Sequence, residues 1–350
     1  MSRIVSVAPV LPENSYSQAH ITTELTNLFT AAPQHHAVIH RLHSASGIGT
    51  RHTVLPLERY AEIADFGEAN SIFIEQGTLL AEKAVLAALD GAGLRAADVD
   101  YIFFTSVTGV AAPSIDGILV HRMGFRPDVK RVPSFGLGCV AGASGIARID
   151  DYLAGHPLGV GLLISLELCS LTLQRGDATM ANFVATGLFG DGAAAVVMVG
   201  EARPEPGITV VDSRSAYYAE THNVIGWNIN GGGFEIVLTP GVAEVININF
   251  LRDVTGFLAG HSLAVSDIDH WVAHPGGPKI LEAFSSALEV PPESFARSWA
   301  TLERAGNLSS AAVLHVLADV IEGGGEQGES GLLFALGPGV SAEFVLLEWS

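Results

Sequence analysis

The chain has few of the residues that mark several common classes of protein. It contains two cysteines in 350 residues, too few for a disulfide framework, and they lack the spacing of a zinc site. No apolar run reaches the roughly 18 residues that a membrane-spanning helix needs. The first residues also lack the apolar core of a signal peptide. We therefore expect a cytoplasmic protein with no membrane span.

Positive charge is also scarce. The 18 Lys and Arg residues stand against 37 Asp and Glu residues, which gives a net charge of -19. Nucleic-acid binding depends on basic side chains that neutralise phosphates, so we do not expect a nucleic-acid partner. The same charge disfavours an acidic protein partner, because like charges slow encounter. A small anionic ligand needs only a local basic cluster and stays open.

Apolar residues and glycine are abundant instead. The chain is 48% hydrophobic and has 39 glycines, which is typical of a compact protein with a large buried sheet. Strand-length apolar runs alternate with helical patterns, of which the clearest ends at glycines. These segments are the strands 99–107, 159–168 and 192–200 and the helix 69–94. The pattern predicts an α/β fold with mostly parallel sheets.

A stretch rich in proline and charge, "GEARPEPG" (200–207), is the best candidate for a linker between two halves. We therefore divide the chain into an N-terminal half, 1–205, and a C-terminal half, 206–350. The order of strand, glycine turn and small-residue helix occurs in both halves, which hints at a duplicated fold.

The glycine-rich stretch "PSFGLGCVAGASGI" (133–146) holds Cys139 at the start of an expected helix. The positive end of a helix dipole favours a thiolate, which is the nucleophilic form. A serine-hydrolase elbow does not fit, because Ile146 stands where a glycine is needed after Ser144. A dinucleotide fingerprint fails at Ala141. Taken alone, a buried structural cysteine is the better interpretation of Cys139.

A catalytic thiol usually works with a histidine and often with an asparagine from elsewhere in the chain. His274 ends the expected strand "DHWVA", where open α/β sheets place active sites. Asn307 stands at another helix start, and a plain N-cap explains it equally well. Four further histidines are interpreted as a solvated helix face rather than a metal site, namely His35, His36, His40 and His43.

Five stretches together resemble the type III polyketide synthases, the chalcone-synthase-like condensing enzymes. They are "GLGCVAGASG", "TGLFGDGAAAVV", "WVAHPGGPKIL", "AGNLSSAAVL" and "LGPGVSAEFVLLEW", in this order. The resemblance extends from about residue 105 to the C-terminus and so covers most of the chain. It implies a homodimer with the thiolase fold, in which two related βαβαβ halves form a five-layered αβαβα core.

The resemblance also implies a catalytic triad of Cys139, His274 and Asn307. Cys139 takes the starter acyl group as a thioester, and His274 stabilises the thiolate and the thioester oxygen. Asn307 shares this oxyanion hole and assists the decarboxylation of malonyl-CoA, whose enolate needs fixed donors. The family uses coenzyme A thioesters, so we expect no metal, no other cofactor and no acyl carrier protein.

Further site residues follow from the same resemblance. Phe189 matches a gatekeeper phenylalanine, and Phe234 is the nearest candidate for the second gatekeeper. The loop Gly337, Pro338 and Gly339 matches the cyclisation-pocket loop of the family. The residues expected to bind coenzyme A are Arg41, Arg51, Gly276, Gly277 and Lys279.

The expected cavity departs from the plant pattern at Ala112 and Cys169, with Thr108 in the same wall. A small Ala112 opens space, which is similar to actinobacterial and mycobacterial members that make alkyl α-pyrones from fatty acyl-CoA. We expect a medium- or long-chain starter with malonyl or methylmalonyl extenders, and an alkylresorcinol is the near alternative. A tetrahydroxynaphthalene from malonyl-CoA alone is disfavoured by Ala112. A carrier-dependent ketoacyl synthase and a silent binding protein are the more distant alternatives.

Overall fold

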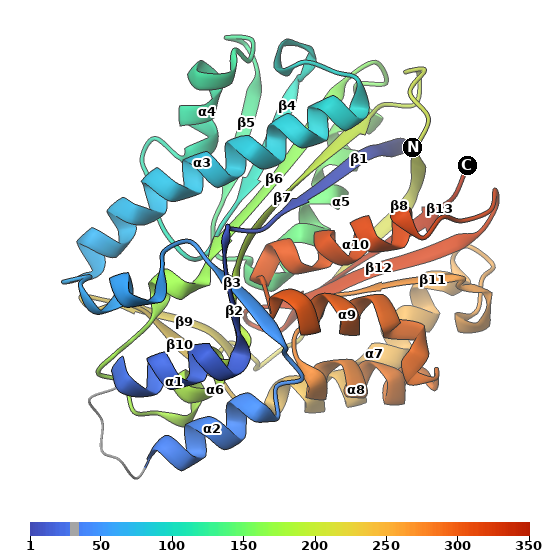
Figure 1. Ribbon diagram of the computed structural model, residues 1–350. Helices are drawn as coiled ribbons and strands as arrows, with labels where there is room; N and C mark the ends of the chain where they lie inside the picture. The colour runs from blue at the N-terminus through green and yellow to red at the C-terminus, as the bar shows by residue number, and fades with distance from the viewer. Residues whose placement is uncertain (29–34) are drawn as a thin grey trace.

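The computed structural model describes residues 1–28 and 35–350, and a nine-stranded mixed sheet is its central feature (Figure 1). The strand order is β11-β12-β13-β8-β1-β7-β6-β4-β5. The strands are β1 (Ser2–Val10), β2 (Asn14–Ser17), β3 (Thr50–Thr53), β4 (Tyr101–Thr105), β5 (Lys130–Ser134), β6 (Val160–Leu168), β7 (Asp191–Val199), β8 (Ile208–Tyr217), β9 (Ile225–Asn230), β10 (Gly233–Leu238), β11 (His270–Ala273), β12 (Ser330–Gly337) and β13 (Ser341–Glu348). Two small antiparallel pairs, β2-β3 and β9-β10, lie outside the large sheet.

The α-helices are α1 (Gln18–Leu28), α2 (His36–Ser44), α3 (Phe66–Ala92), α4 (Ile115–Met123), α5 (Ala141–Ala154), α6 (Met180–Leu188), α7 (Gly241–Ala259), α8 (Pro278–Leu288), α9 (Ala296–Ala305) and α10 (Ala312–Glu322). Short 3-10 helices include η2 (Leu57–Ala61), η4 (Gly138–Val140), η5 (Cys169–Thr172) and η8 (Ser309–Ala311).

The two halves of the sheet have the same topology. The order β4-β6-β7-β1 in the N-terminal half recurs as β11-β12-β13-β8 in the C-terminal half. In each set the first pair is parallel and the next two are antiparallel. The halves meet where β1 pairs with β8. The duplication at which the sequence hinted is therefore present in the strand topology.

The expectation of mostly parallel sheets was wrong. Within the large sheet only the pairs β4-β5, β4-β6 and β11-β12 are parallel. The strands β12 and β13 are joined by a turn of three residues at 338–340. So short a connection permits only antiparallel pairing, because parallel neighbours need a crossover of a dozen or more residues.

The three largest apolar clusters of the described residues fill the spaces between five layers. The first lies between α3 and the N-terminal half of the sheet and includes Phe73 and Leu80. The second fills the space around α5 and α10 between the two halves of the sheet, with Ile146 and Val313. The third packs α7 and α8 on the C-terminal half around Phe250. Figure 1 shows α3 at one side of these layers and α7 and α8 at the other, which gives the expected αβαβα core.

Several sequence predictions agree closely with the observed elements. The helix expected over 69–94 is α3, which Asp65 caps and which ends at Gly93 in the left-handed region with φ of 65°. The expected linker 200–207 is the loop that joins β7 to β8. Among the described residues, no helix combines the length and the apolar character needed to cross a membrane.

Candidate active site

Cys139 lies in a tight turn between β5 and α5. It belongs to η4, the short 3-10 helix that precedes α5, and it is 7% exposed. The residue before it, Gly138, has a φ of 57°, which favours glycine. A Cβ at Gly138 would lie 2.4 Å from Cδ of Pro338. The glycine therefore lets the Cys139 turn pack directly against the loop 337–339.

A chain of contacts joins the three residues of the expected triad. The Cys139 thiol donates to Oγ of Ser309 at 3.6 Å, and the Ser309 amide donates to Oδ1 of Asn307 at 2.8 Å. Nδ2 of Asn307 donates to the carbonyl of Gly276 at 3.2 Å. The Gly276 amide in turn donates to the carbonyl of His274 at 2.9 Å. The structure thus links the segments that carry Cys139, Asn307 and His274, which are far apart in the sequence.

Asn307 is not the N-cap of α10, although its Oδ1 accepts from the amide of Ser309 at the start of η8. The α10 helix begins only at Ala312, and its N-cap position is Ala311. The Asn307 backbone is fixed by two hydrogen bonds to the segment of Phe189, from the Asn307 amide to Leu188 and from the Gly190 amide to Asn307. The position of Asn307 is therefore tied to that of the expected gatekeeper.

Both members of the Cys139–His274 pair are neutral in the resting protein. Burial raises the pKa of Cys139 to about 12 and lowers the pKa of His274 to about 3. Burial therefore opposes the thiolate that the position of Cys139 before α5 was expected to favour. Nδ1 of His274 is buried and has no hydrogen-bond partner among the residues described. A neutral imidazole is able to accept the thiol proton as the nucleophile attacks.

Glu167 is a site residue that the sequence reasoning missed. Its carboxylate accepts hydrogen bonds from Oγ1 of Thr108 at 2.9 Å, from the amide of Val107 at 3.1 Å and from Oγ of Ser310. Burial raises the pKa of Glu167 to about 6, and its charge contributes to the raised pKa of Cys139. One signal was available, because a carboxylate inside the apolar strand "VGLLISLEL" is costly unless it is partnered.

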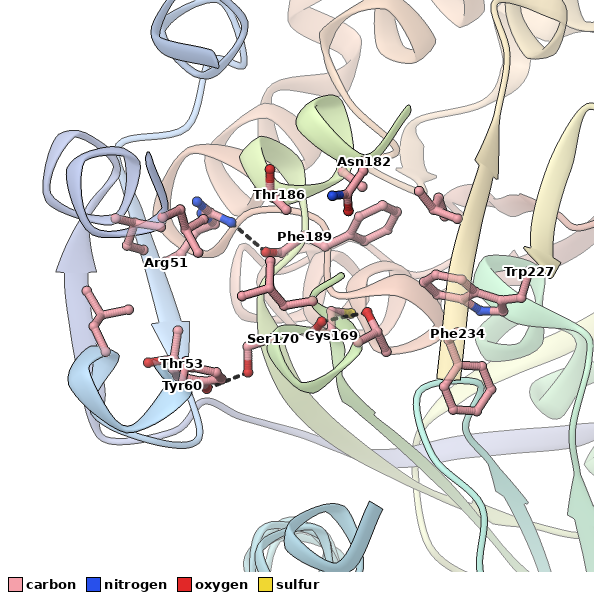
Figure 2. A pocket seen from close by; sticks show the side chains of 17 residues that line it. Arg51, Thr53, Tyr60, Cys169, Ser170, Asn182, Thr186, Phe189, Trp227 and Phe234 are labelled. Atoms are coloured by element: carbon pink, nitrogen blue, oxygen red, sulfur yellow. Dashed lines mark hydrogen bonds between the residues drawn. The ribbon is translucent and has the colours of Figure 1, made fainter. Parts of the chain in front are cut away.

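A cavity of about 60 Å³ lies elsewhere in the molecule, and Cys139, His274 and Asn307 are not among the residues that line it (Figure 2). Its wall includes three expected substrate-binding residues, Cys169, Phe189 and Phe234. Thr108 is buried and directs its hydroxyl to Glu167. Ala112 was expected in the wall but is exposed in the loop before α4, so its small side chain does not enlarge this cavity.

The comparisons with known proteins decide the family. Residues 2–203 match the N-terminal domain of chalcone and stilbene synthases, and residues 209–349 match the C-terminal domain. The chain belongs to the chalcone and stilbene synthase family. It is thus a type III polyketide synthase, an acyltransferase with the thiolase fold.

Individual relatives of the synthase are similar over nearly the whole chain. A 1,3,6,8-tetrahydroxynaphthalene synthase from Streptomyces peucetius subsp. caesius is 48% identical, over 99% of this chain and 93% of the relative. An α-pyrone synthesis polyketide synthase-like Pks18 from Mycobacterium tuberculosis is 31% identical, over 99% and 90%. The crystal structure of the 1,3,6,8-tetrahydroxynaphthalene synthase from Streptomyces coelicolor A3(2) covers 99% of both chains at 32% identity, with a TM-score of 0.94.

The residues that the sequence assigned to coenzyme A lie in two places in the synthase. Arg41 on α2 and Lys279 on α8 are exposed. The turn after α2 lies close to the start of α8, since a Cβ at Gly47 would be 3.6 Å from Pro278. The two cations therefore stand on neighbouring elements beside Gly276 and Gly277. Arg51, in contrast, is only 4% exposed and lies in the wall of the cavity.

The histidine cluster of the synthase is not a uniformly solvated face. His40 is exposed, but His43 is buried, contacts Oγ1 of Thr22 at 2.9 Å and the carbonyl of Phe183 at 3.2 Å, and has its pKa lowered to about 4 by burial. Over residues 1–28 and 35–350, no group of His, Cys, Asp and Glu side chains is arranged to hold a metal ion.

Proposed function

We propose that the synthase condenses malonyl-CoA, used both as starter and as extender, into a 1,3,6,8-tetrahydroxynaphthalene-type product. The observation that carries the proposal is the similarity over nearly the whole chain to one relative. The 48% identical relative is named for this product. Ala112 does not disfavour this product, because it is exposed and does not line the cavity.

The proposed reaction begins with loading of the starter. The Cys139 sulfur attacks the thioester carbonyl of malonyl-CoA while its proton passes to His274. Coenzyme A leaves as a thiol after taking a proton back, and the acyl group stays on Cys139. Because Cys139 and His274 are neutral before the reaction, negative charge develops on the thioester oxygen only during the attack. Fixed hydrogen-bond donors, rather than water, stabilise this charge in the buried site.

Extension then requires an enolate. A second malonyl-CoA loses CO₂, and the electron pair of the broken carbon–carbon bond forms the enolate. One N–H of Asn307 is bonded to Gly276, and the other is available for the enolate oxygen together with His274. The enolate carbon attacks the Cys139 thioester and displaces the sulfur, which leaves the extended chain on coenzyme A. The chain then returns to Cys139 with release of coenzyme A as a thiol, so each cycle adds one unit and releases one CO₂ and one coenzyme A.

The remaining features of the proposal concern substrates and assembly. Arg41 and Lys279 hold the phosphates of coenzyme A, with the Gly276–Gly277 turn beside the pantetheine arm. We further propose a cytoplasmic homodimer that uses neither a metal nor another cofactor. Free coenzyme A thioesters serve as substrates without an acyl carrier protein, in keeping with the shortage of basic residues for docking such a partner.

A second candidate product is an alkyl α-pyrone made from a medium- or long-chain acyl-CoA, or the related alkylresorcinol. It is supported by the apolar side chains Ile21, Leu25 and Leu57 on the outer wall of the cavity. The relative Pks18 is named for α-pyrone synthesis. A long chain requires these side chains to move and extend the cavity.

Product analysis separates the two candidates. The purified synthase is incubated with labelled malonyl-CoA alone, and then with each member of an acyl-CoA panel from C2 to C20. Mass spectrometry reports the starter, the number of extensions and the type of ring. We expect tetrahydroxynaphthalene from malonyl-CoA alone. Alkylpyrones formed only with an added acyl-CoA reject the first candidate, and strict dependence on a malonyl carrier protein rejects both.

A further inference from the structure

The cavity between α1, α6 and β10 contains one buried cation. Arg51, on β3, lies in a wall that is otherwise formed largely by apolar side chains (Figure 2). The opposite side of the wall carries Trp227 and Phe234. A guanidinium in such surroundings needs polar partners, because its desolvation is expensive.

Only part of the Arg51 guanidinium has such partners. Nε donates to Oε1 of Gln18 at 2.8 Å, and Nη1 donates to the carbonyl of Phe189 at 2.8 Å. Nη2 is buried and has no hydrogen-bond partner within residues 1–28 and 35–350. Two N–H groups of a fixed, planar donor are thus enclosed without an acceptor.

The nearest acidic group does not use these donors. Asp191 favours the charged form of Arg51, but its oxygens accept from the amide of Val54 at 2.7 Å and from the amide and hydroxyl of Ser170 at 2.7 and 2.5 Å. Burial lowers the pKa of Arg51 to about 10, so the guanidinium is charged at neutral pH.

Other polar side chains in the wall are already bonded to the protein. The Thr53 hydroxyl donates to the carbonyl of Leu55 at 2.7 Å, and the Tyr60 hydroxyl is bonded to Oγ of Ser170 at 2.5 Å. Nδ2 of Asn182 donates to two backbone carbonyls, at 2.9 and 2.7 Å. Among the side-chain nitrogen and oxygen atoms of this wall in the described residues, only Nη2 of Arg51 is both buried and without a partner.

We propose that Arg51 is the residue that selects the starter, by donating from Nη2 to the free carboxylate of a malonyl group in this cavity. This inference rests on the function proposed above. A carboxylate matches the planar donor and neutralises the buried charge. A fatty acyl chain leaves Nη2 unpaired, and a site built for a polar group strongly rejects an analogue that lacks it. Arg51 donates to the carbonyl of Phe189, and Phe189 pairs with Asn307 through the backbone. The proposed carboxylate site is therefore connected to Asn307.

The first test is a competition between starters. Equimolar malonyl-CoA and hexanoyl-CoA are given to the wild type, to Arg51→Gln and to Arg51→Lys, and malonyl-primed and hexanoyl-primed products are counted. We expect the ratio to fall at least tenfold in Arg51→Gln, and less in Arg51→Lys, which keeps the charge. Arg304→Gln is the matched control, because Arg304 pairs with Asp319 on α10 away from the cavity. We expect this control to keep the wild-type ratio.

The second test needs no variant and so does not depend on the folding of Arg51→Gln. Loading of Cys139 in the wild type is followed by intact-protein mass spectrometry, with malonyl-CoA and with its methyl ester, which lacks the negative charge. We expect loading from malonyl-CoA to be at least tenfold faster. Equal loading rates, or an unchanged product ratio in a folded Arg51→Gln protein, overturn the role of Arg51 while product from malonyl-CoA alone still supports the proposed function. Failure of the wild type to use malonyl-CoA as a starter overturns both.

Discussion

The close contact between α5 and η8 predicts that a larger residue at Gly142 disturbs the active site. Gly142, on α5, faces the backbone of η8, and a Cβ there would lie 2.3 Å from the carbonyl oxygen of Ser310 and 2.8 Å from Val313. Ordinary contacts begin at about 3.4 Å, so Gly142→Ala has to separate the two segments by about 1 Å. Ser309 lies in η8, and its hydrogen-bond partner Cys139 lies in η4, directly before α5.

The expected magnitudes differ for stability and for activity. Overpacking of this kind costs about 1–3 kcal/mol. With an unfolding entropy of about 2.1 cal/mol/K per residue, that lowers the Tm by only about 1.5–4 °C for a chain of this length. A displacement of about 1 Å between reacting groups, in contrast, lowers the rate about 100-fold. Gly142→Ala is therefore expected to fold but to lose most of its condensing activity.

The assay measures kcat with malonyl-CoA together with the Tm from thermal unfolding. Gly155→Ala is the matched control, because Gly155 follows the same helix and its nearest neighbour would be 3.7 Å from an added Cβ. We expect wild-type values for the control. A Gly142→Ala protein with wild-type kcat refutes the claim that the α5–η8 contact sets the catalytic geometry.

Three further predictions concern protonation and the hydrogen bonds of the site. Asn307→Ala leaves the buried Ser309 amide without its acceptor, which should lower the free energy of unfolding by about 1–3 kcal/mol. It should also reduce the rate of CO₂ release from malonyl-CoA about 100-fold. Undiminished release contradicts the role of Asn307. Burial lowers the pKa of His315 to about 4, so the unfolded chain binds a proton that the folded chain does not, and stability falls as the pH drops from 6.5 to 4. His315→Gln should reduce the slope of unfolding free energy against pH by about 1.4 kcal/mol per unit in this range, as measured by urea denaturation, and an unchanged slope contradicts the assignment. Burial raises the pKa of the Cys139 thiol to about 12, so the rate of its alkylation by iodoacetamide should rise about tenfold per pH unit between pH 8 and 10. The rate should also exceed that of Cys169, whose pKa burial raises as well. A rate that is already constant near pH 7 indicates a resting ion pair and contradicts the prediction.

The order of the elements was accessible from the sequence because its signals are local, whereas the triad was predicted from the resemblance to the family. Cys139 and His274 each follow a strand, but Asn307 follows the helix α9. The duplicated pattern was also visible, but the strand directions were not. The antiparallel return of β13 depends on pairing across the sheet, which a pattern of apolar residues does not encode.

The structure differs from the remaining predictions at residues whose burial could not be predicted from the sequence. Arg51 was grouped with the phosphate-binding cations, yet the packing of α1 and α6 around it makes it a cavity residue. Ala112 was placed in the cavity by its position next to Pro113, but the loop leaves it exposed. The charge state of Cys139 depends on the desolvation of the assembled core, which no local stretch reveals.

The central claim is that Cys139 carries the growing chain. The most direct measurement is peptide mapping by mass spectrometry after brief incubation of the synthase with labelled malonyl-CoA. We predict the label on the peptide that contains Cys139, and neither label nor product in Cys139→Ala, a small change at a buried site that should preserve the fold. Label on the Cys169 peptide, or product from the Cys139→Ala protein, contradicts the claim.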